Sequence, residues 1–210
     1  MLFRSPGTAH FDLAAAAGMN FLGSDHVILE EVVLREALML DSDSRTLQVL
    51  LTPKGTGAEF QIFSQSRKDG QSGGDWHLHV SGALSAPPFS GEEKAVDLEQ
   101  LRSRCPEVVD IAAYYEKFDA FGAVQYGPAF RGLRRLWRSQ GEAVAEVDLD
   151  RRAAGGNEGF VIHPAVLDSC LQSMVAALAT REKDIGGDGF MPLDRKRDRK
   201  STRLNSSHGR

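Results

Sequence analysis

The chain has 210 residues, of which 41% are hydrophobic and 26% are charged, and its formal net charge of −4 fits an ordinary globular protein. No apolar run approaches the ~20 residues that a membrane-spanning helix needs, and no basic segment followed by an apolar one opens the chain, so neither a membrane span nor a signal peptide is expected. The two cysteines, Cys105 and Cys170, lie far apart without metal-ligand spacing, which favours a reducing, cytoplasmic location.

The first half of the chain predicts one helix followed by an antiparallel sheet. The stretch PGTAHFDLAAAAG (6–18) opens with a proline, which a first helical turn tolerates, and becomes rich in alanine. It therefore predicts a helix over 7–17, with Gly18 as its stop signal. Strands are predicted in four segments rich in β-branched or alternating apolar residues: 26–34, 45–52, 58–65 and 76–82. The turn PKGTG joins the second and third strands as a hairpin, the fourth should face His77 and His79 outward, and the four should form a meander.

The second half repeats this theme with a different opening. The stretch SAPPFSGEEKAVDLEQ (85–100) predicts a linker, since it holds two prolines and several charges. A helix is predicted over 106–122, followed by strands over 130–139 and 142–149, a loop, and a long helix from His163. That last helix is apolar on nearly every face, which is typical of a buried helix. The predicted domains are therefore an N-terminal unit (6–86), a linker (87–103) and a C-terminal unit (104–193).

The two ends of the chain differ in character from the rest. The tail 194–210 carries seven Lys or Arg and two acidic residues, so its formal charge is +5 and the remaining chain carries −9. Its stretch DRKSTRLNSSH resembles a translated sequencing adapter, and LFRS (2–5) resembles the translated end of the paired adapter. We therefore expect a native segment of about 6–197 cut from a longer reading frame, with a disordered, non-native tail over 194–210. A genuine basic tail is the alternative.

A carboxylate in the last predicted helix is the first candidate for chemistry. Asp168 and Gln172 are four residues apart, so they project from the same face of that helix. Asp168 lies in the apolar stretch VIHPAVLDSCLQ, and burial favours the neutral form of a carboxyl group. A carboxyl group that keeps its proton near neutral pH can act as a general acid.

Four motifs together resemble one enzyme family. YGPAF (126–130) and HPAVLDSCLQ (163–172) match YGPxF and HPxxLDxxxQ of the dehydratase domains in modular type I polyketide synthases and animal fatty acid synthases. PGTA (6–9) and WHLHVSG (76–82) also match, so the resemblance covers essentially the whole native segment. It implies an α+β fold, the double hotdog, in which two antiparallel sheets each wrap a central helix. Here that fold should be incomplete, with central helices over 7–17 and 164–179.

The resemblance also implies a reaction and a role for each site residue. The family eliminates water from a β-hydroxyacyl chain on an acyl carrier protein and leaves an α,β-unsaturated thioester. Asp168 would be the proton donor, and Gln172 would orient Asp168 or the substrate hydroxyl. Tyr126 would hydrogen-bond the leaving oxygen. The remaining positions are substrate-binding, with the backbone N–H of Gly7 stabilising charge on the thioester oxygen: Gly7, Gly127 and Pro128.

The base of that reaction would lie outside this chain. The family's catalytic His belongs to an HxxxGxxxxP motif whose last residue matches Pro6, so Met1 stands at the Gly position and the His would precede it. We therefore expect this fragment to be inactive although its family is enzymatic. His163 is expected to cap the last helix because it precedes Pro164, and Asp12 is expected to be structural.

No cofactor or metal is expected, because the sequence has no metal-ligand spacing and no glycine-rich phosphate loop. The expected partners are the carrier protein with its phosphopantetheine arm, neighbouring synthase domains and a second copy in a homodimer, but neither nucleic acid nor a membrane. RGLRRLWR (131–138) is a candidate docking segment for the carrier protein. Two other functions stay open: a non-catalytic double hotdog that binds acyl chains or holds a synthase together, and a product-template type of double hotdog that guides cyclisation.

Overall fold

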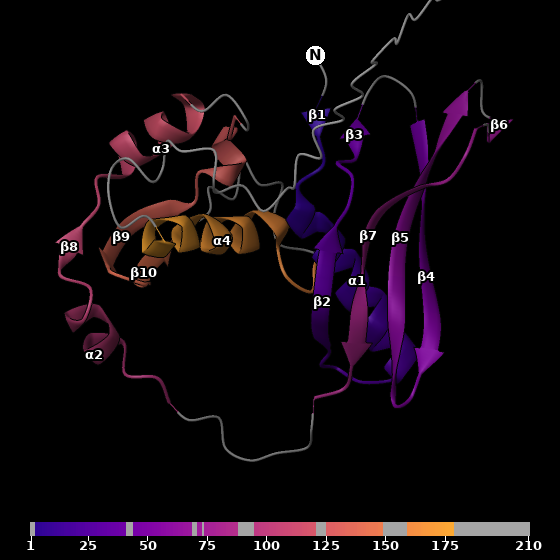
Figure 1. Cartoon of the computed structure of the whole chain (residues 1–210), viewed down its shortest axis with the longest axis horizontal. Coiled ribbons are helices and arrows are strands. Elements are labelled where there is room, and N and C mark those ends of the chain that lie inside the picture. Colours follow the sequence, from indigo (N-terminus) through magenta and orange to yellow (C-terminus); the bar gives the residue numbers. More distant parts are fainter. Residues whose placement is uncertain are drawn as a thin grey trace, which may run out of the picture.

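The structure is a computed structural model, and it describes residues 3–40, 44–68, 71–72, 74–87, 95–120, 125–148 and 159–178. These residues form two units, each with a sheet and a long helix (Figure 1). The first unit contains α1 (Gly7–Leu22), β2 (Ile28–Leu34), β4 (Ser44–Lys54), β5 (Gly57–Lys68), β6 (Gln71–Ser72) and β7 (His77–Ser85), beside the short pair β1 (Phe3–Arg4) and β3 (Met39–Leu40). The second contains α2 (Leu98–Ser103), β8 (Glu107–Val108), α3 (Ile111–Ala120), the 3₁₀ helix η1 (Pro128–Phe130), β9 (Leu133–Ser139), β10 (Glu142–Val147) and α4 (Pro164–Leu178).

The first sheet is antiparallel and has the strand order β2-β7-β5-β4, with β6 paired to β5. The predicted β4–β5 hairpin is confirmed by an unbroken register from Ser44↔Arg67 to Lys54↔Gly57. The predicted simple meander is wrong, because β2 pairs with β7 and not with β4. The chain crosses from one side of the sheet to the other between β2 and β4, so the first and last long strands of the unit become neighbours.

Helix α1 packs against this sheet and runs further than the sequence predicted. It ends at Gly23, whose φ of 62° is left-handed and whose N–H donates to the carbonyl of Met19. Gly18 lies inside the helix and is buried. A Cβ added there would lie 3.1 Å from side-chain atoms of Leu84 and Val27. Because Gly18 has no side chain, α1 can pack closely against Leu84 and Val27. Gly23 is the residue that ends the helix.

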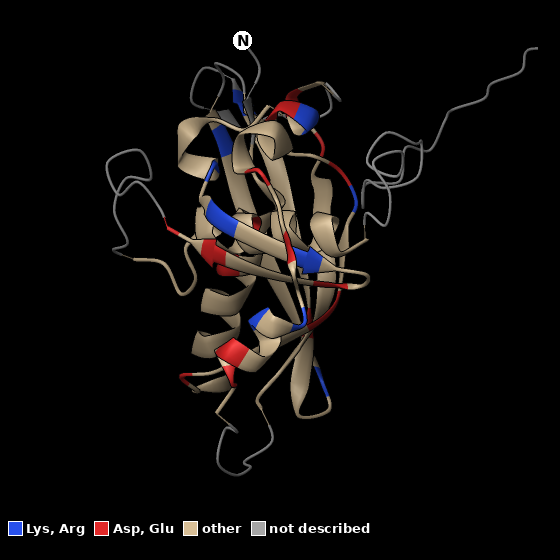
Figure 2. Ribbon diagram, turned by 90° about the vertical axis from the view of Figure 1, so that its left-hand side faces the viewer, with Lys and Arg blue, Asp and Glu red and all other residues tan. Residues whose placement is uncertain are grey.

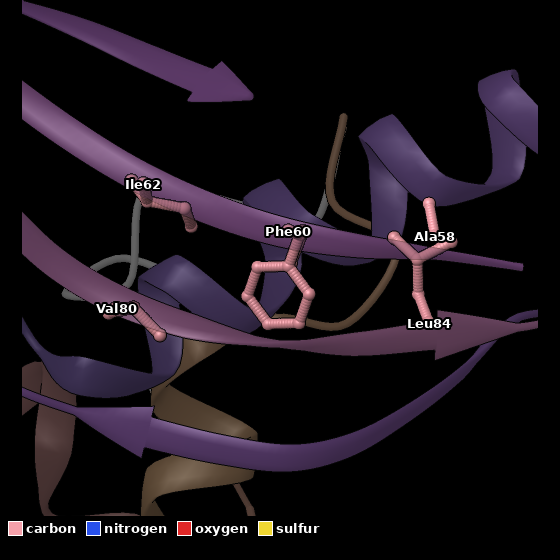
Figure 3. Close-up of a cluster of buried hydrophobic side chains, with 6 residues drawn as sticks. Ala58, Phe60, Ile62, Val80 and Leu84 are labelled. Atoms are coloured by element: carbon pink, nitrogen blue, oxygen red, sulfur yellow. The ribbon is translucent and has the colours of Figure 1, made fainter. Parts of the chain in front are cut away.

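The core of the first unit lies between α1 and the middle strands. Phe60 and Ile62 of β5 and Val80 and Leu84 of β7 point into it (Figure 3). All four are at most 2% exposed, and Ala14 of α1 completes the cluster with Ala58. The alternation of AEFQIFSQ thus predicts correctly which residues of β5 face inward.

The alternation predicted for β7 is wrong at His79. The β5–β7 register shifts so that Ile62 pairs with Val80 and Phe63 with Leu78, which leaves His79 as an extra residue. This bulge turns His79 inward, where it is 3% exposed. Its Nε2 lies 2.7 Å from the hydroxyl of Ser64, and its Nδ1 lies 3.0 Å from the carbonyl oxygen of Glu36.

The second sheet has the order β10-β9-β8, and α4 packs across β9 and β10. The helix predicted over 106–122 is shorter in the structure, where 107–108 form β8 and α3 begins after Asp110, whose carboxylate accepts the N–H of Ala113. Its predicted end at Gly122 lies outside the described residues. Part of the predicted linker forms α2, which Asp97 caps by accepting the N–H of Gln100. The domain boundaries at 86 and 104 stay predictions.

Helix α4 is buried along one face, not all round as predicted. The buried face holds small or polar residues: Pro164, Ala165, Ser169, Gln172 and Ala176. Within the described residues, Leu171, Met174 and Leu178 are 39%, 54% and 48% exposed. In the same part of the chain, no helix is long and apolar enough to cross a membrane.

Candidate active site

The start of α4 is held by side chains from both units. His163 accepts the N–H of Ala165 on its Nδ1 at 3.1 Å, which confirms that it caps the helix. The carboxylate of Asp12, on α1, accepts the N–H groups of Val161 at 2.8 Å and Ile162 at 3.1 Å. The structural role predicted for Asp12 is therefore confirmed, and it consists in fixing the segment that leads into α4.

Asp168 and Gln172 lie on the side of α4 that faces η1. The Nε2 of Gln172 donates to Oδ2 of Asp168 at 2.7 Å and to the carbonyl oxygen of Phe130 at 2.9 Å. Burial raises the pKa of Asp168, and the hydrogen bond from Gln172 opposes part of that rise. The site therefore holds a half-buried carboxyl group that keeps its proton to a higher pH than an exposed aspartate.

The YGPAF motif places a phenol within the electrostatic influence of this carboxyl group. Tyr126 precedes η1, and its ring meets those of Tyr115 and Phe118 edge-on, with centroids 6.4 and 5.5 Å apart. Burial raises the pKa of Tyr126 well above its ordinary value, and the nearby charge of Asp168 adds to the rise. The phenol thus remains a hydrogen-bond donor. The structure brings together three of the predicted site residues: Asp168, Gln172 and Tyr126.

The predicted substrate-binding residues lie in two different units. Gly127 and Pro128 form the exposed start of η1, directly after Tyr126. Gly7 is the first residue of α1 and lies in the other unit, where a Cβ would meet the side chain of Leu34 at 3.0 Å. Among the described residues, no hydrogen bond or ring contact joins Gly7 to Asp168.

Sequence reasoning missed two residues of the site, Tyr114 and Tyr115 of α3. The hydroxyl of Tyr114 donates to the backbone carbonyl of Gln172, and that of Tyr115 donates to its side-chain Oε1, each at 2.9 Å. Both are buried with Leu133, Leu136 and Ala176 in the core of the second unit. One signal was present in the sequence, because the chain has three tyrosines and all lie within 114–126.

The arginines of RGLRRLWR do not form an unneutralised basic surface. Arg131 pairs with Asp119 at 2.8 Å, Arg135 with Glu146 at 3.3 Å, and Arg138 with Glu107. Arg134 and Asp148 are 3.8 Å apart. Figure 2 shows acidic segments next to basic ones in this unit. Any docking of an acidic partner here would have to compete with these carboxylates.

Comparison with protein families relates this geometry to known proteins. Residues 4–65 match the model of the polyketide synthase dehydratase domain, and residues 93–197 match the model of the polyketide synthase dehydratase N-terminal domain. The second match alone spans half of the chain. The chain belongs to the polyketide synthase dehydratase family.

Curated relatives of this dehydratase-family chain are large synthases. It is 33% identical over 190 residues to the polyketide synthase GfsE of Streptomyces halstedii, a match that covers 90% of the chain and 5% of that synthase. It is 38% identical over 173 residues to the mycoketide-CoA synthase of Mycobacterium tuberculosis, covering 82% of the chain and 4% of the synthase. The chain thus spans a small part of the relatives it matches.

Solved dehydratase domains share the fold. The CurK dehydratase from the curacin polyketide synthase, crystallised as inactive Asp-to-Asn and His-to-Phe mutants, matches with a TM-score of 0.73 and 30% identity. The match covers 84% of this chain and 60% of that one. The predicted α+β double-hotdog fold is therefore confirmed, and the chain covers part of it.

Proposed function

We propose that the chain carries the acid side of a dehydratase site, which removes water from a β-hydroxyacyl thioester and leaves an α,β-enoyl thioester. The observation that carries this proposal is the Asp168 carboxyl group: in a dehydratase-family chain, it is half buried, it has a raised pKa, and it is hydrogen-bonded to Gln172 beside Tyr126. A carboxyl group of this kind suits a general acid.

Each residue has a defined part in the proposed elimination. A base removes the proton from the α-carbon, the electron pair forms the new double bond, and the bond between the β-carbon and the hydroxyl oxygen breaks. Asp168 gives its proton to that oxygen, which leaves as water. Gln172 orients the carboxyl group, and Tyr126 hydrogen-bonds the departing oxygen. Gly7, Gly127 and Pro128 would contact the substrate, with the backbone N–H of Gly7 at the thioester oxygen.

In this proposal the base is not one of the 210 residues. The family's His would precede Met1 when the HxxxGxxxxP motif is placed on Pro6. A His-to-Phe change leaves the CurK dehydratase inactive, and so does an Asp-to-Asn change. We therefore expect the chain alone to lack turnover and to gain it when an external base is supplied.

Chemical rescue tests this proposal. The chain is incubated with a β-hydroxyacyl thioester of N-acetylcysteamine, with and without imidazole, and the conjugated product is followed by ultraviolet absorbance. We expect dehydration that depends on imidazole and that falls by at least ~100-fold in Asp168→Asn. Glu116→Gln, a matched change at an exposed position of α3, should keep the rescued rate. An Asp168→Asn chain that is rescued as well as the unaltered one would contradict the role of Asp168.

The second candidate function is an acyl-binding or structural double hotdog without turnover. The positions of the described histidines favour it, because four of them belong to the first unit and the fifth, His163, binds the N–H of Ala165. The ring centroids of His10 and His79 lie 6.2 Å apart in the first unit. His163 caps α4, and His26 and His77 are exposed. Binding of the thioester without any imidazole-dependent product would favour this function. The product-template alternative stays a prediction.

The proposed substrate arrives on the phosphopantetheine arm of an acyl carrier protein, so the proposed reaction needs no separate cofactor. The large synthases that match the chain support a multidomain parent with neighbouring synthase domains. A homodimeric parent and a cytoplasmic location belong to the same proposal. In the described part of the chain, no group of three or more His, Cys, Asp or Glu side chains is arranged to hold a metal ion.

A further inference from the structure

The side-chain amide of Gln172 is held at both ends. Its Nε2 faces two acceptors, the carboxyl group of Asp168 at 2.7 Å and the carbonyl oxygen of Phe130 at 2.9 Å. Its Oε1 accepts from the hydroxyl of Tyr115 at 2.9 Å. A carbonyl oxygen can only accept, so the nitrogen must face Phe130 and the oxygen must face Tyr115. The amide therefore has one satisfied orientation in this site.

Tyr115 can donate to Gln172 because its own oxygen is already engaged by a donor. The backbone N–H of Leu133, at the start of β9, donates to that oxygen at 3.3 Å. The hydroxyl proton is thereby directed to Gln172. Tyr115 is 5% exposed, and burial raises the pKa of its phenol, which keeps that proton in place. A chain of three hydrogen bonds thus runs from Leu133 through Tyr115 and Gln172 to Asp168.

We propose that Tyr115 is a positioning residue for Asp168: its hydroxyl fixes the Gln172 amide so that Nε2 points at the carboxyl group. Tyr115 touches neither Asp168 nor the reacting atoms in this proposal, and it acts through Gln172. The catalytic meaning of the inference rests on the proposed function. The hydrogen-bond relation itself does not, and it can be measured without substrate.

The charged groups that act on Tyr115 are Arg131, Arg134 and Asp168, and all three can be kept constant. The guanidinium of Arg131 lies 5.3 Å from the ring centroid of Tyr115 and pairs with Asp119. The ring of Tyr126 meets that of Tyr115 edge-on, with centroids 6.4 Å apart. A change of Tyr115 to Phe leaves the ring for these contacts and removes the hydroxyl alone.

Tyr114 provides a matched control. It is the adjacent residue, it is 3% exposed, and its hydroxyl donates to the same residue at the same distance of 2.9 Å. Its acceptor, however, is the backbone carbonyl of Gln172, which cannot turn with the amide. Tyr114→Phe and Tyr115→Phe therefore each remove one buried hydroxyl, and only the second releases the amide.

The experiment is a carbon-13 NMR titration of the Asp168 carboxyl group in the 210-residue chain. Gln172→Leu should raise its pKa, because the hydrogen bond to the carboxylate is lost. Tyr115→Phe should raise it in the same direction, by roughly half to one pH unit. The double variant should rise no further than Gln172→Leu, and Tyr114→Phe should leave the value in place. An unchanged pKa in Tyr115→Phe, or an equal rise in Tyr114→Phe, would overturn the inference.

A second measurement needs no variant and covers the case in which Tyr115→Phe does not fold. In the unaltered chain the Tyr115 hydroxyl proton should exchange slowly with solvent. One of the two Nε2 protons of Gln172 should follow the titration of Asp168. A Tyr115 hydroxyl that exchanges as fast as an exposed phenol would overturn the inference. Failure of imidazole rescue with these NMR results intact would instead count against the proposed function alone.

Discussion

At Asp168, burial and hydrogen bonding act on one carboxyl group in opposite directions. Burial raises its pKa, and the amide of Gln172 stabilises the charged form and lowers it. Because burial is the larger effect, the folded chain binds the proton of Asp168 more tightly than the unfolded chain does. Ionising this group in the folded state therefore lowers the free energy of unfolding.

This difference predicts a pH dependence of stability. The unfolding free energy should fall as pH rises from the ordinary pKa of 3.8 to the raised value in the folded chain. Asp168→Asn cannot titrate, so it should gain stability relative to the unaltered chain over that window. Urea unfolding from about pH 3 to about pH 7 measures the difference.

Glu107→Gln serves as the opposite control for that prediction. A hydrogen bond from Arg138 lowers the pKa of Glu107 below its ordinary 4.5. The stabilisation from the Glu107–Arg138 pair is present above the ordinary pKa of 4.5. It is lost as pH falls through the lowered pKa of Glu107. The relative stability of Glu107→Gln should therefore change with pH in the opposite sense. A difference between Asp168→Asn and the unaltered chain that stays constant with pH would contradict the raised pKa.

At the scale of the elements, two irregular pairings shape the first sheet. The extra residue on β7 turns His79 inward, and a second irregularity lies where β2 pairs with β7. There Glu31 has a φ of 52°, and Gly82 lies opposite the shift between Glu30 and Val33. Strands β2 and β7 can come this close together because Gly82 has no side chain.

Gly82→Ala should therefore destabilise the fold. The added Cβ would lie 2.7 Å from Cε1 of Phe60 and 2.9 Å from the carbonyl oxygen of Glu30, so a core ring or the strand backbone must move. We expect a loss of about 1–3 kcal/mol in urea unfolding. The matched change Gly127→Ala, where a Cβ meets nothing within 4 Å, should cost little. Equal stabilities of the two variants would contradict the predicted clash.

Most of the element order could be predicted because helical and strand periodicity are local properties. The Asp168–Gln172 pair could be predicted for the same reason, since a spacing of four places both on one helix face. The burial of His79 could not, because it depends on the register between β5 and β7. The hydrogen bond of Tyr115 could not either, because its partner lies 57 residues away. Both features that sequence reasoning missed depend on contacts between residues that are distant in the sequence.

At the scale of the whole molecule, a carboxylate of the first unit is hydrogen-bonded to the segment that leads into α4. Asp12 belongs to α1, and its Oδ1 accepts two backbone N–H groups of the segment before α4. Asp12 is 9% exposed, and hydrogen bonds to a charged, buried acceptor are among the stronger ones in proteins. The position of α4, and with it of Asp168, thus depends on the first unit.

Asp12→Ala should loosen this connection. It leaves two backbone donors without their acceptor, and we expect a loss of about 1–3 kcal/mol in the free energy of unfolding. Amide hydrogen exchange at Val161 and Ile162 should become faster, which NMR measures residue by residue. Asp12→Asn retains an oxygen acceptor and should lose less. Unchanged exchange at both amides in Asp12→Ala would contradict this role.

The Asp12 contact also bears on the order in which the parts of the chain can fold. The carboxylate and the amides it binds are separated by 149 and 150 residues. Closing so long a loop is slow, and domains made on the ribosome begin to fold from the N-terminus. The first unit can therefore present its acceptor before α4 has been synthesised. On this view, α4 docks onto a surface that already exists, and the acid site forms after the first unit.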